Sequence, residues 1–224
     1  MLLNDDFSAR AVVHAAAMDW VPSPTKGVER RMLFRIGDEK ARATSIVRYA
    51  RGSHFPAHGH PGGEEILVLD GVFQDESGDY PAGSYIRNPP GSAHRPGSEP
   101  GCMIFVKLWQ FRKDDGAYVA HRPGDGIPAA SWPGVAASRK LFDNGHEEVR
   151  LEDWAASGNV EIANPEGLEL LVLDGAFTDG REDFQPLSWL RLPPGMHLKA
   201  RTGARGARVW MKAGALLQDN ICPF

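Results

Sequence analysis

The chain has 224 residues, of which 42% are hydrophobic and 24% are charged, and its formal net charge is −4. This composition is typical of a folded globular protein and excludes a disordered chain. A mildly acidic balance provides no concentrated basic face, so we expect neither nucleic acid nor a membrane surface as a partner.

The first ten residues do not look like an export signal. Asn4, Asp5 and Asp6 stand where a signal peptide needs a basic segment followed by an apolar run. No stretch of about 18 apolar residues, the length of a membrane-spanning helix, follows them. Two cysteines, Cys102 and Cys222, are too few for the disulfide framework of a small secreted domain. We therefore expect a soluble, cytoplasmic protein.

Short segments rich in Val, Ile, Leu, Phe and Tyr, separated by scattered glycines and prolines, predict a mostly β structure. At most one helical turn is expected, near Ala11 to Met18. In chain order, the predicted strands are Ala43 to Tyr49, Glu65 to Leu69, Ser84 to Arg87, Met103 to Trp109, Glu169 to Leu173, Trp189 to Leu192 and Arg208 to Lys212.

An internal repeat relates the two halves of the chain. The segment Pro61 to Gly91 aligns with Pro165 to Gly195 without a gap, at an offset of 104 residues, and 16 of the 31 aligned positions are identical. Between the copies, Arg112 to Ser131 has the composition of turns and loops. We predict an N-terminal extension over 1–19, a first β domain over 20–115, a linker over 116–130 and a second β domain over 131–224.

The first copy carries histidines and an acid at a spacing that suits one metal ion. His58 and His60 are two residues apart, so on a strand both imidazoles project from the same face. The turn Pro61-Gly62-Gly63 then brings Glu64 beside them, and a second turn returns His94. Imidazole and carboxylate suit Zn(II) or Fe(II), with Ni(II) and Mn(II) as further options. The spacing does not choose the metal.

These residues resemble the two sequence motifs of the cupin superfamily. The first motif, Gly-x5-His-x-His-x3-Glu-x6-Gly, is matched by Gly52, His58, His60, Glu64 and Gly71. The second motif, Gly-x5-Pro-x-Gly-x2-His-x3-Asn, is matched by Gly83, Pro89, Gly91 and His94, with Ser98 in place of the final Asn. The resemblance implies an all-β protein of two tandem cupin barrels (double-stranded β-helix or jelly roll), that is, a bicupin, with the ion inside the first barrel.

Within the superfamily, Trp20 to Phe111 is similar to the cupin domain of ChrR-type anti-sigma factors and to small dioxygenases that cleave acetylacetone and related compounds. The first likeness implies a zinc-binding sensor in regulation or stress response. The second implies a non-haem Fe(II) dioxygenase acting on a small carbonyl compound. A purely structural role for the ion is a third hypothesis, and the same four residues serve all three.

Two expectations concern partners. ChrR-type regulators hold their sigma factor with a separate N-terminal helical domain, whereas only residues 1–19 precede Trp20 here, which argues against direct sigma-factor binding. If Glu64 faces inward, Leu67 and Leu69 face outward and require cover from the other domain or a second chain. We therefore expect a homodimer. A small-molecule ligand or substrate is a further expected partner.

The second copy keeps the repeat but not the ligands. At the offset of 104, the four positions become Ile162, Asn164, Leu168 and Leu198. We predict a degenerate second cupin that is filled by side chains and binds no metal.

Other candidates lie near the motifs. His54, Phe73 and Tyr85 are candidates for supporting the ligands or lining a pocket. Cys102 is a candidate oxidant-sensing thiol, with a buried structural cysteine as the alternative. No catalytic acid or base is identifiable outside the ligand set.

Overall fold

The computed structural model describes residues 1–214, 216 and 220–223. Nearly all of its regular structure is β, which confirms the all-β class expected from the sequence. The helical turn expected near Ala11 to Met18 is only the 3-10 turn η1 (Ala15–Ala17), because β2 (Ala11–His14) is paired as a strand. No helix in the described part of the chain has the length and apolarity needed to span a membrane.

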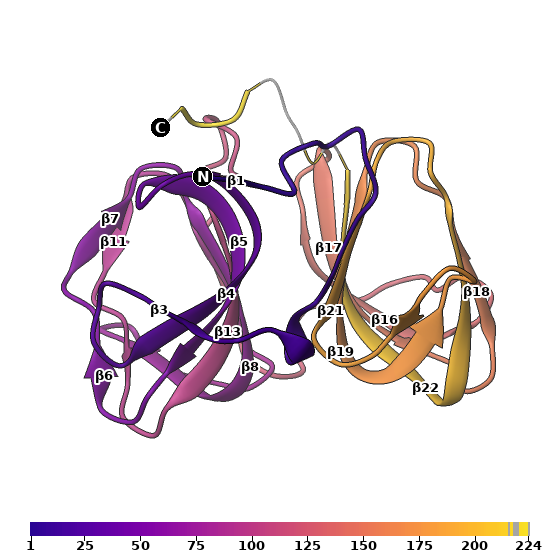
Figure 1. Ribbon diagram of the computed structural model, residues 1–224, viewed down its shortest axis with the longest axis horizontal. Helices are drawn as coiled ribbons and strands as arrows, with labels where there is room; N and C mark the ends of the chain where they lie inside the picture. Colours follow the sequence, from indigo (N-terminus) through magenta and orange to yellow (C-terminus); the bar gives the residue numbers. More distant parts are fainter. Residues whose placement is uncertain (215, 217–219, 224) are drawn as a thin grey trace. The chain divides into compact units, whose positions relative to one another are not determined.

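The chain divides into two compact units, drawn mainly in indigo to magenta and mainly in salmon to yellow (Figure 1). Of the described residues, 1–5, 18–125 and 220–223 belong to the first unit, and 6–17, 126–214 and 216 to the second. The units therefore do not follow the chain in two consecutive blocks. The N-terminal strand β2 belongs to the second unit, where it pairs with β21 (Ser188–Leu192).

In the first unit, one antiparallel sheet carries the long strands. Its spatial order is β4 (Val28–Gly37), β5 (Ala41–Tyr49), β13 (Cys102–Leu108), β8 (Glu64–Asp75) and β10 (Tyr85–Asn88), with β1 (Leu2–Leu3) and β14 (Val119–His121) at its ends. The short strands β3 (Val21–Pro22), β6 (Ser53–His54), β9 (Gly78–Pro81) and β12 (Gly97–Ser98) pair beside this path. A separate antiparallel pair, β7 (His58–His60) and β11 (Ser92–His94), lies across the unit from β4 and β5 (Figure 1).

The interior of the first unit follows from strand alternation. Ile66 and Val68 on β8 join the apolar core with Ile104 and Val106 of β13. Because successive side chains of a strand point to opposite faces, Glu64 faces the same side as Ile66. The side chain of Glu64, at the start of β8, therefore lies on the same inner face as the apolar core.

In the second unit, the repeat reappears as the same strand order. The main path runs β15 (Ile127–Pro128), β16 (Val135–Asp143), β17 (Glu147–Trp154), β22 (Leu198–Gly214), β19 (Leu168–Thr178), β21 and β2. The strands β18 (Asn159–Ile162) and β20 (Asp183–Phe184) pair beside it. Strands β19 and β21 take the places of β8 and β10, so the repeat in the sequence corresponds to a repeat of β pairing.

Candidate metal centre

Two short strands position the three histidines. In the antiparallel pair β7–β11, His94 is the cross-strand partner of His58, and His60 lies two residues further along β7. The amide of Gly91 donates to the carbonyl of His60 at 2.9 Å, which closes the turn that leads into β11. The ring centroids of His60 and His94 are 4.6 Å apart, and those of His58 and His60 are 4.9 Å apart. Strand register therefore brings the three imidazoles together.

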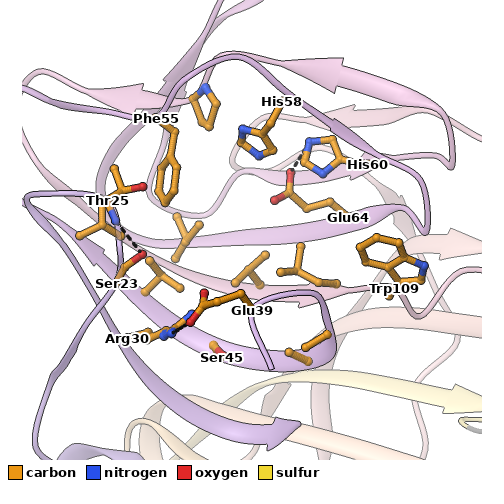
Figure 2. Close-up of a pocket in the computed structure, with 18 of the residues that line it drawn as sticks. Ser23, Thr25, Arg30, Glu39, Ser45, Phe55, His58, His60, Glu64 and Trp109 are labelled. Carbon is orange, nitrogen blue, oxygen red and sulfur yellow. Dashed lines mark hydrogen bonds and ion pairs between the residues drawn. The ribbon is translucent and has the colours of Figure 1, made fainter. Parts of the chain in front are cut away.

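Glu64, the first residue of β8, completes the cluster. Its Oε2 atom lies 3.4 Å from Nε2 of His60 and 3.3 Å from Nε2 of His94. Taken together, the four side chains offer ligand atoms that all lie within 4.8 Å of one another. His60, Glu64 and His94 are buried, whereas His58 is exposed. Figure 2 shows the two imidazoles of β7 beside the carboxylate of Glu64.

Outer hydrogen bonds fix the orientation of the ligand side chains. Nδ1 of His58 donates to the carbonyl of Pro56 at 2.9 Å, and Nδ1 of His94 lies 3.3 Å from Oδ2 of Asp75. Asn88 donates from its side-chain amide to Oε2 of Glu64 at 3.1 Å. A hydrogen bond at Nδ1 leaves Nε2 of the same ring available as a metal ligand.

The cluster is electrostatically coupled. Burial raises the pKa of Glu64, but His94, His60 and Asn88 together outweigh burial and hold that pKa below its usual value. For His94, burial lowers the pKa, but Asp75 and Glu64 more than compensate and raise it to about 9. Burial lowers the pKa of His60. Perturbed pKa values of this kind cluster at functional sites.

The donor set fits a divalent metal ion. Nε2 of His60 and Nε2 of His94 are buried and, apart from their approach to Oε2 of Glu64, have no hydrogen-bond partner among the described residues. Buried polar atoms in native proteins are otherwise nearly always paired, so these two atoms point to a ligand between them. Three imidazole nitrogens and one carboxylate oxygen are borderline to hard donors, which suits Zn(II), Fe(II), Ni(II) or Mn(II).

A cavity of about 400 Å³ opens beside the cluster. His58, His60 and Glu64 form part of its lining. Its apolar surface comes from β5 and β13, including Val47, Ile104 and Leu108, and the aromatic rings of Phe55 and Trp109 also border it (Figure 2). The candidate ligands therefore face a space that is large enough for a small organic molecule.

Three further candidates from the sequence occupy different places. His54 is exposed, and its Nε2 lies 3.0 Å from Glu99 rather than at the cluster. Phe73 contacts the cluster from the core, with its ring centroid 6.0 Å from that of His94. Tyr85 is absent from the cavity lining, because its hydroxyl donates to Glu65 at 2.7 Å on the opposite face of the sheet. Cys102 is a buried free thiol in the core.

Sequence reasoning missed several residues around the site. Asp75 and Asn88 support the ligands, and Trp109, Arg30 and Arg35 line the cavity. Trp109 adopts a φ of 59°, which is unfavourable for a residue other than glycine, and its indole donates to the carbonyl of Pro223 at 2.8 Å. No sequence motif marks these positions.

The second unit uses the equivalent positions differently. Ile162 pairs with Leu198 in the register in which His58 pairs with His94, and both lie in the apolar core with Leu168. Asn164, in the place of His60, donates from its side-chain amide to the carbonyls of Pro193 and Met196. These positions form core and turn contacts in the second unit.

Residues 8–112 match the ChrR cupin-like domain family. Over most of its length the chain is also similar to solved structures. A candidate dioxygenase from Nostoc punctiforme PCC 73102 shares 13% identity at a TM-score of 0.73, over 97% of this chain and 87% of that one. A candidate glyoxylate-induced protein from Pseudomonas aeruginosa shares 15% identity at a TM-score of 0.72, over 97% and 92%. The pirin YhhW from Escherichia coli, in complex with nickel(II), shares 14% identity at a TM-score of 0.67, over 92% and 99%. At these identities the likeness shows a shared fold.

Proposed function

We propose that this chain is a cupin, as the match of residues 8–112 to the ChrR cupin-like domain family supports, and that its first unit binds one divalent metal ion that takes part in recognising a small molecule. His58, His60, Glu64 and His94 would hold the ion, with Zn(II) and Fe(II) as the preferred metals. A divalent ion supplies Lewis acidity toward an oxygen atom of a ligand in the cavity. The observation that carries this proposal is the cavity bordered by three of the four ligand side chains.

The cavity favours ligand recognition over a purely structural ion. A structural metal site is closed, with every position taken by protein, whereas a site that handles ligands keeps one position open. His58 is exposed, and its Nδ1 is held by Pro56 so that Nε2 remains for the ion. Phe55, whose ring centroid is 5.8 Å from that of His58, lines the same cavity beside this imidazole.

The family likeness supports a regulatory role, in which occupancy of the cavity is the signal. We infer a ChrR-type bicupin in which the first unit carries the metal and the second unit keeps the strand order without ligands. Ile162, Leu168 and Leu198 in the apolar core support this assignment. Such a protein would act in regulation or stress response as a sensor of a small molecule.

The proposal is tested with Co(II), whose visible absorption reports its ligands. The Co(II)-loaded protein is titrated with azide, and we expect a change in the visible spectrum because the cavity gives azide access to the ion. A His58→Ala variant should lose the Co(II) spectrum. A wild-type spectrum that azide leaves unchanged would indicate a closed site and would exclude ligand recognition at the metal.

A second candidate function, a non-haem Fe(II) dioxygenase, is favoured by the same cavity and by imidazole and carboxylate ligands without a thiolate. The assay is oxygen uptake by the Fe(II)-loaded protein with pentane-2,4-dione and related dicarbonyl compounds. An enzyme would consume oxygen in proportion to substrate, and His94→Ala would abolish this uptake. A sensor would bind the same compounds without consuming oxygen.

A further inference from the structure

The cavity beside the metal centre contains a buried positive charge. Arg35 of β4 lines it and is only 5% exposed. The guanidinium donates from Nε to the carbonyl of Gly37 at 3.3 Å and from Nη2 to the carbonyl of Asp38. Burial, followed by the charge of Arg30, lowers the pKa of Arg35. In the described residues Arg35 makes no ion pair with a carboxylate, and the charges of Glu39 and Asp38 act on it only at longer range.

A second guanidinium faces the same space. Arg30 lines the cavity from the same strand, and its Nη2 lies 3.2 Å from Oε1 of Glu39. The side chain of Glu39 is 69% exposed and also lines the cavity, so its carboxylate offsets part of the positive charge of Arg30. Nε of Arg30 is buried and has no hydrogen-bond partner among the described residues. Both arginines therefore present donors that protein acceptors do not fill.

A β-bulge turns Arg35 into the cavity. Along β4, Met32 pairs with Ser45 and Phe34 pairs with Thr44, so the pairing skips one residue between them. With strict alternation from Arg30, residue 35 would face outward, but the extra residue reverses the alternation and Arg35 faces inward beside Ala43. Bulges of this kind commonly redirect a side chain next to a functional site.

The remaining walls are largely apolar and leave room for a ligand. Ala41, Ala43 and Val47 of β5 line the cavity, and Ser23, Thr25 and Ser45 add hydroxyl groups to it. Figure 2 shows Arg30 and Glu39 across the cavity from the imidazoles of His58 and His60. A molecule in this space would therefore meet positive charge at one end and the metal centre at the other.

We propose that the cavity binds a small organic acid whose carboxylate is held by Arg35 and Arg30, with its apolar body directed toward the metal centre. The placement of the other end rests on the metal site proposed above. A buried charge requires a partner, and a carboxylate matches the planar fork of a guanidinium. The apolar walls favour an organic acid over inorganic phosphate.

The test compares oxo acids with uncharged ketones of the same shape. The probes are 4-oxopentanoate, 5-oxohexanoate and 6-oxoheptanoate against hexane-2,5-dione, heptane-2,6-dione and octane-2,7-dione, measured by calorimetric titration of the zinc-loaded protein. We expect at least one oxo acid to bind about tenfold or more tightly than its dione, because a charge-assisted hydrogen bond is worth at least one order of magnitude in affinity.

Variants then assign the preference to the arginines. Arg35→Gln is expected to remove it, Arg30→Gln to reduce it, and Arg35→Lys to retain part of it. Arg48→Gln serves as the matched control, because Arg48 pairs with Glu29 on an exposed part of β5 and is absent from the cavity lining. Folding of each variant is checked by circular dichroism and metal content. If Arg35→Gln does not fold, Arg30→Gln and Arg35→Lys carry the test.

The same titrations on metal-free protein separate the two proposals. The arginines are not metal ligands, so the preference for oxo acids over diones should persist without metal, even if no metal site exists. Equal binding of oxo acids and diones to the wild type, or a preference that survives the folded arginine variants, would overturn the organic-acid proposal. Inorganic phosphate binding more tightly than every oxo acid would also overturn it.

Discussion

At the scale of single residues, His94 lies between two carboxylates, one near each of its ring nitrogens. Nδ1 lies 3.3 Å from Asp75, and Nε2 lies 3.3 Å from Glu64. A carboxylate behind a ligating histidine fixes the ring and makes it more basic, and its loss typically weakens metal binding about 10- to 100-fold. Asp75 would thus act on a bound metal ion through His94.

We predict that Asp75→Asn weakens zinc affinity by about one to two orders of magnitude while the fold remains intact. The measurement is competition with a metallochromic chelator. Asp79→Asn is the matched control, because Asp79 is an exposed acid on β9 that accepts a hydrogen bond from Gln74. Equal zinc affinities of Asp75→Asn and the wild type would show that Asp75 does not support the site.

The thiol of Cys102 is predicted to be inert in the folded protein. Its side chain lies in the core, and burial raises its pKa to about 11. The thiolate is the reactive form, so at pH 8 only about one molecule in a thousand would carry it. In a Cys222→Ser background, an Ellman reagent should react with Cys102 in urea but not under native conditions. Rapid native reaction would instead support an oxidant-sensing thiol.

At the scale of elements, some close contacts between paired strands require glycine. Gly71 has a φ of 69°, and a Cβ atom there would lie 2.1 Å from the carbonyl oxygen of Gly101. Gly91, in the turn before β11, has a φ of 87° but open space around it. An alanine at Gly91 therefore carries only the backbone cost of about 1–2 kcal/mol, whereas at Gly71 it also meets a backbone clash.

We predict that Gly71→Ala destabilises the protein more than Gly91→Ala does, as measured by urea denaturation. The second unit supplies an internal replicate. Gly175 has a φ of 69° with a carbonyl oxygen 2.2 Å from its Cβ position, and Gly195 has open space. We therefore expect Gly175→Ala to be less stable than Gly195→Ala. Equal losses of stability within either pair of variants would show that the close contacts at Gly71 and Gly175 tolerate a side chain.

Strand alternation and turn chemistry explain why the clustering of the four candidate ligands could be predicted. His58 and His60 share a face because they are two residues apart, and each predicted strand lies largely within an observed one. The contact of Asp75 with His94 could not be predicted, because it depends on how the end of β8 and the strand β11 lie in the folded unit, and no local pattern reports this. Arg35 was missed because the bulge on β4 leaves no sequence signal and reverses the alternation.

At the scale of the whole molecule, one backbone arrangement serves two different interiors. The amide of Gly195 donates to the carbonyl of Asn164 at 2.8 Å, as Gly91 donates to His60 in the first unit. The second unit therefore keeps this backbone hydrogen bond although Asn164 replaces His60. Leu198, which occupies the place of His94, is 2% exposed in the apolar core.

Equivalent substitutions should therefore have different consequences. Leu198→Ala leaves a cavity in an apolar core, and we expect it to cost about 2–5 kcal/mol of stability without changing metal content. His94→Ala should remove the metal. Urea denaturation and elemental analysis of both variants check this contrast. Loss of metal in Leu198→Ala, with the protein still folded, would contradict the assignment of the ion to the first unit.

The most direct measurement is the metal content of protein purified without chelator or nickel resin, by elemental mass spectrometry. We predict about one zinc or iron ion per chain, absent from His58→Ala and unchanged in His197→Ala, since Nδ1 of His197 already accepts the amide of Asn164. A wild-type protein without metal after supplementation, or a folded His58→Ala variant with full metal content, would contradict the metal centre.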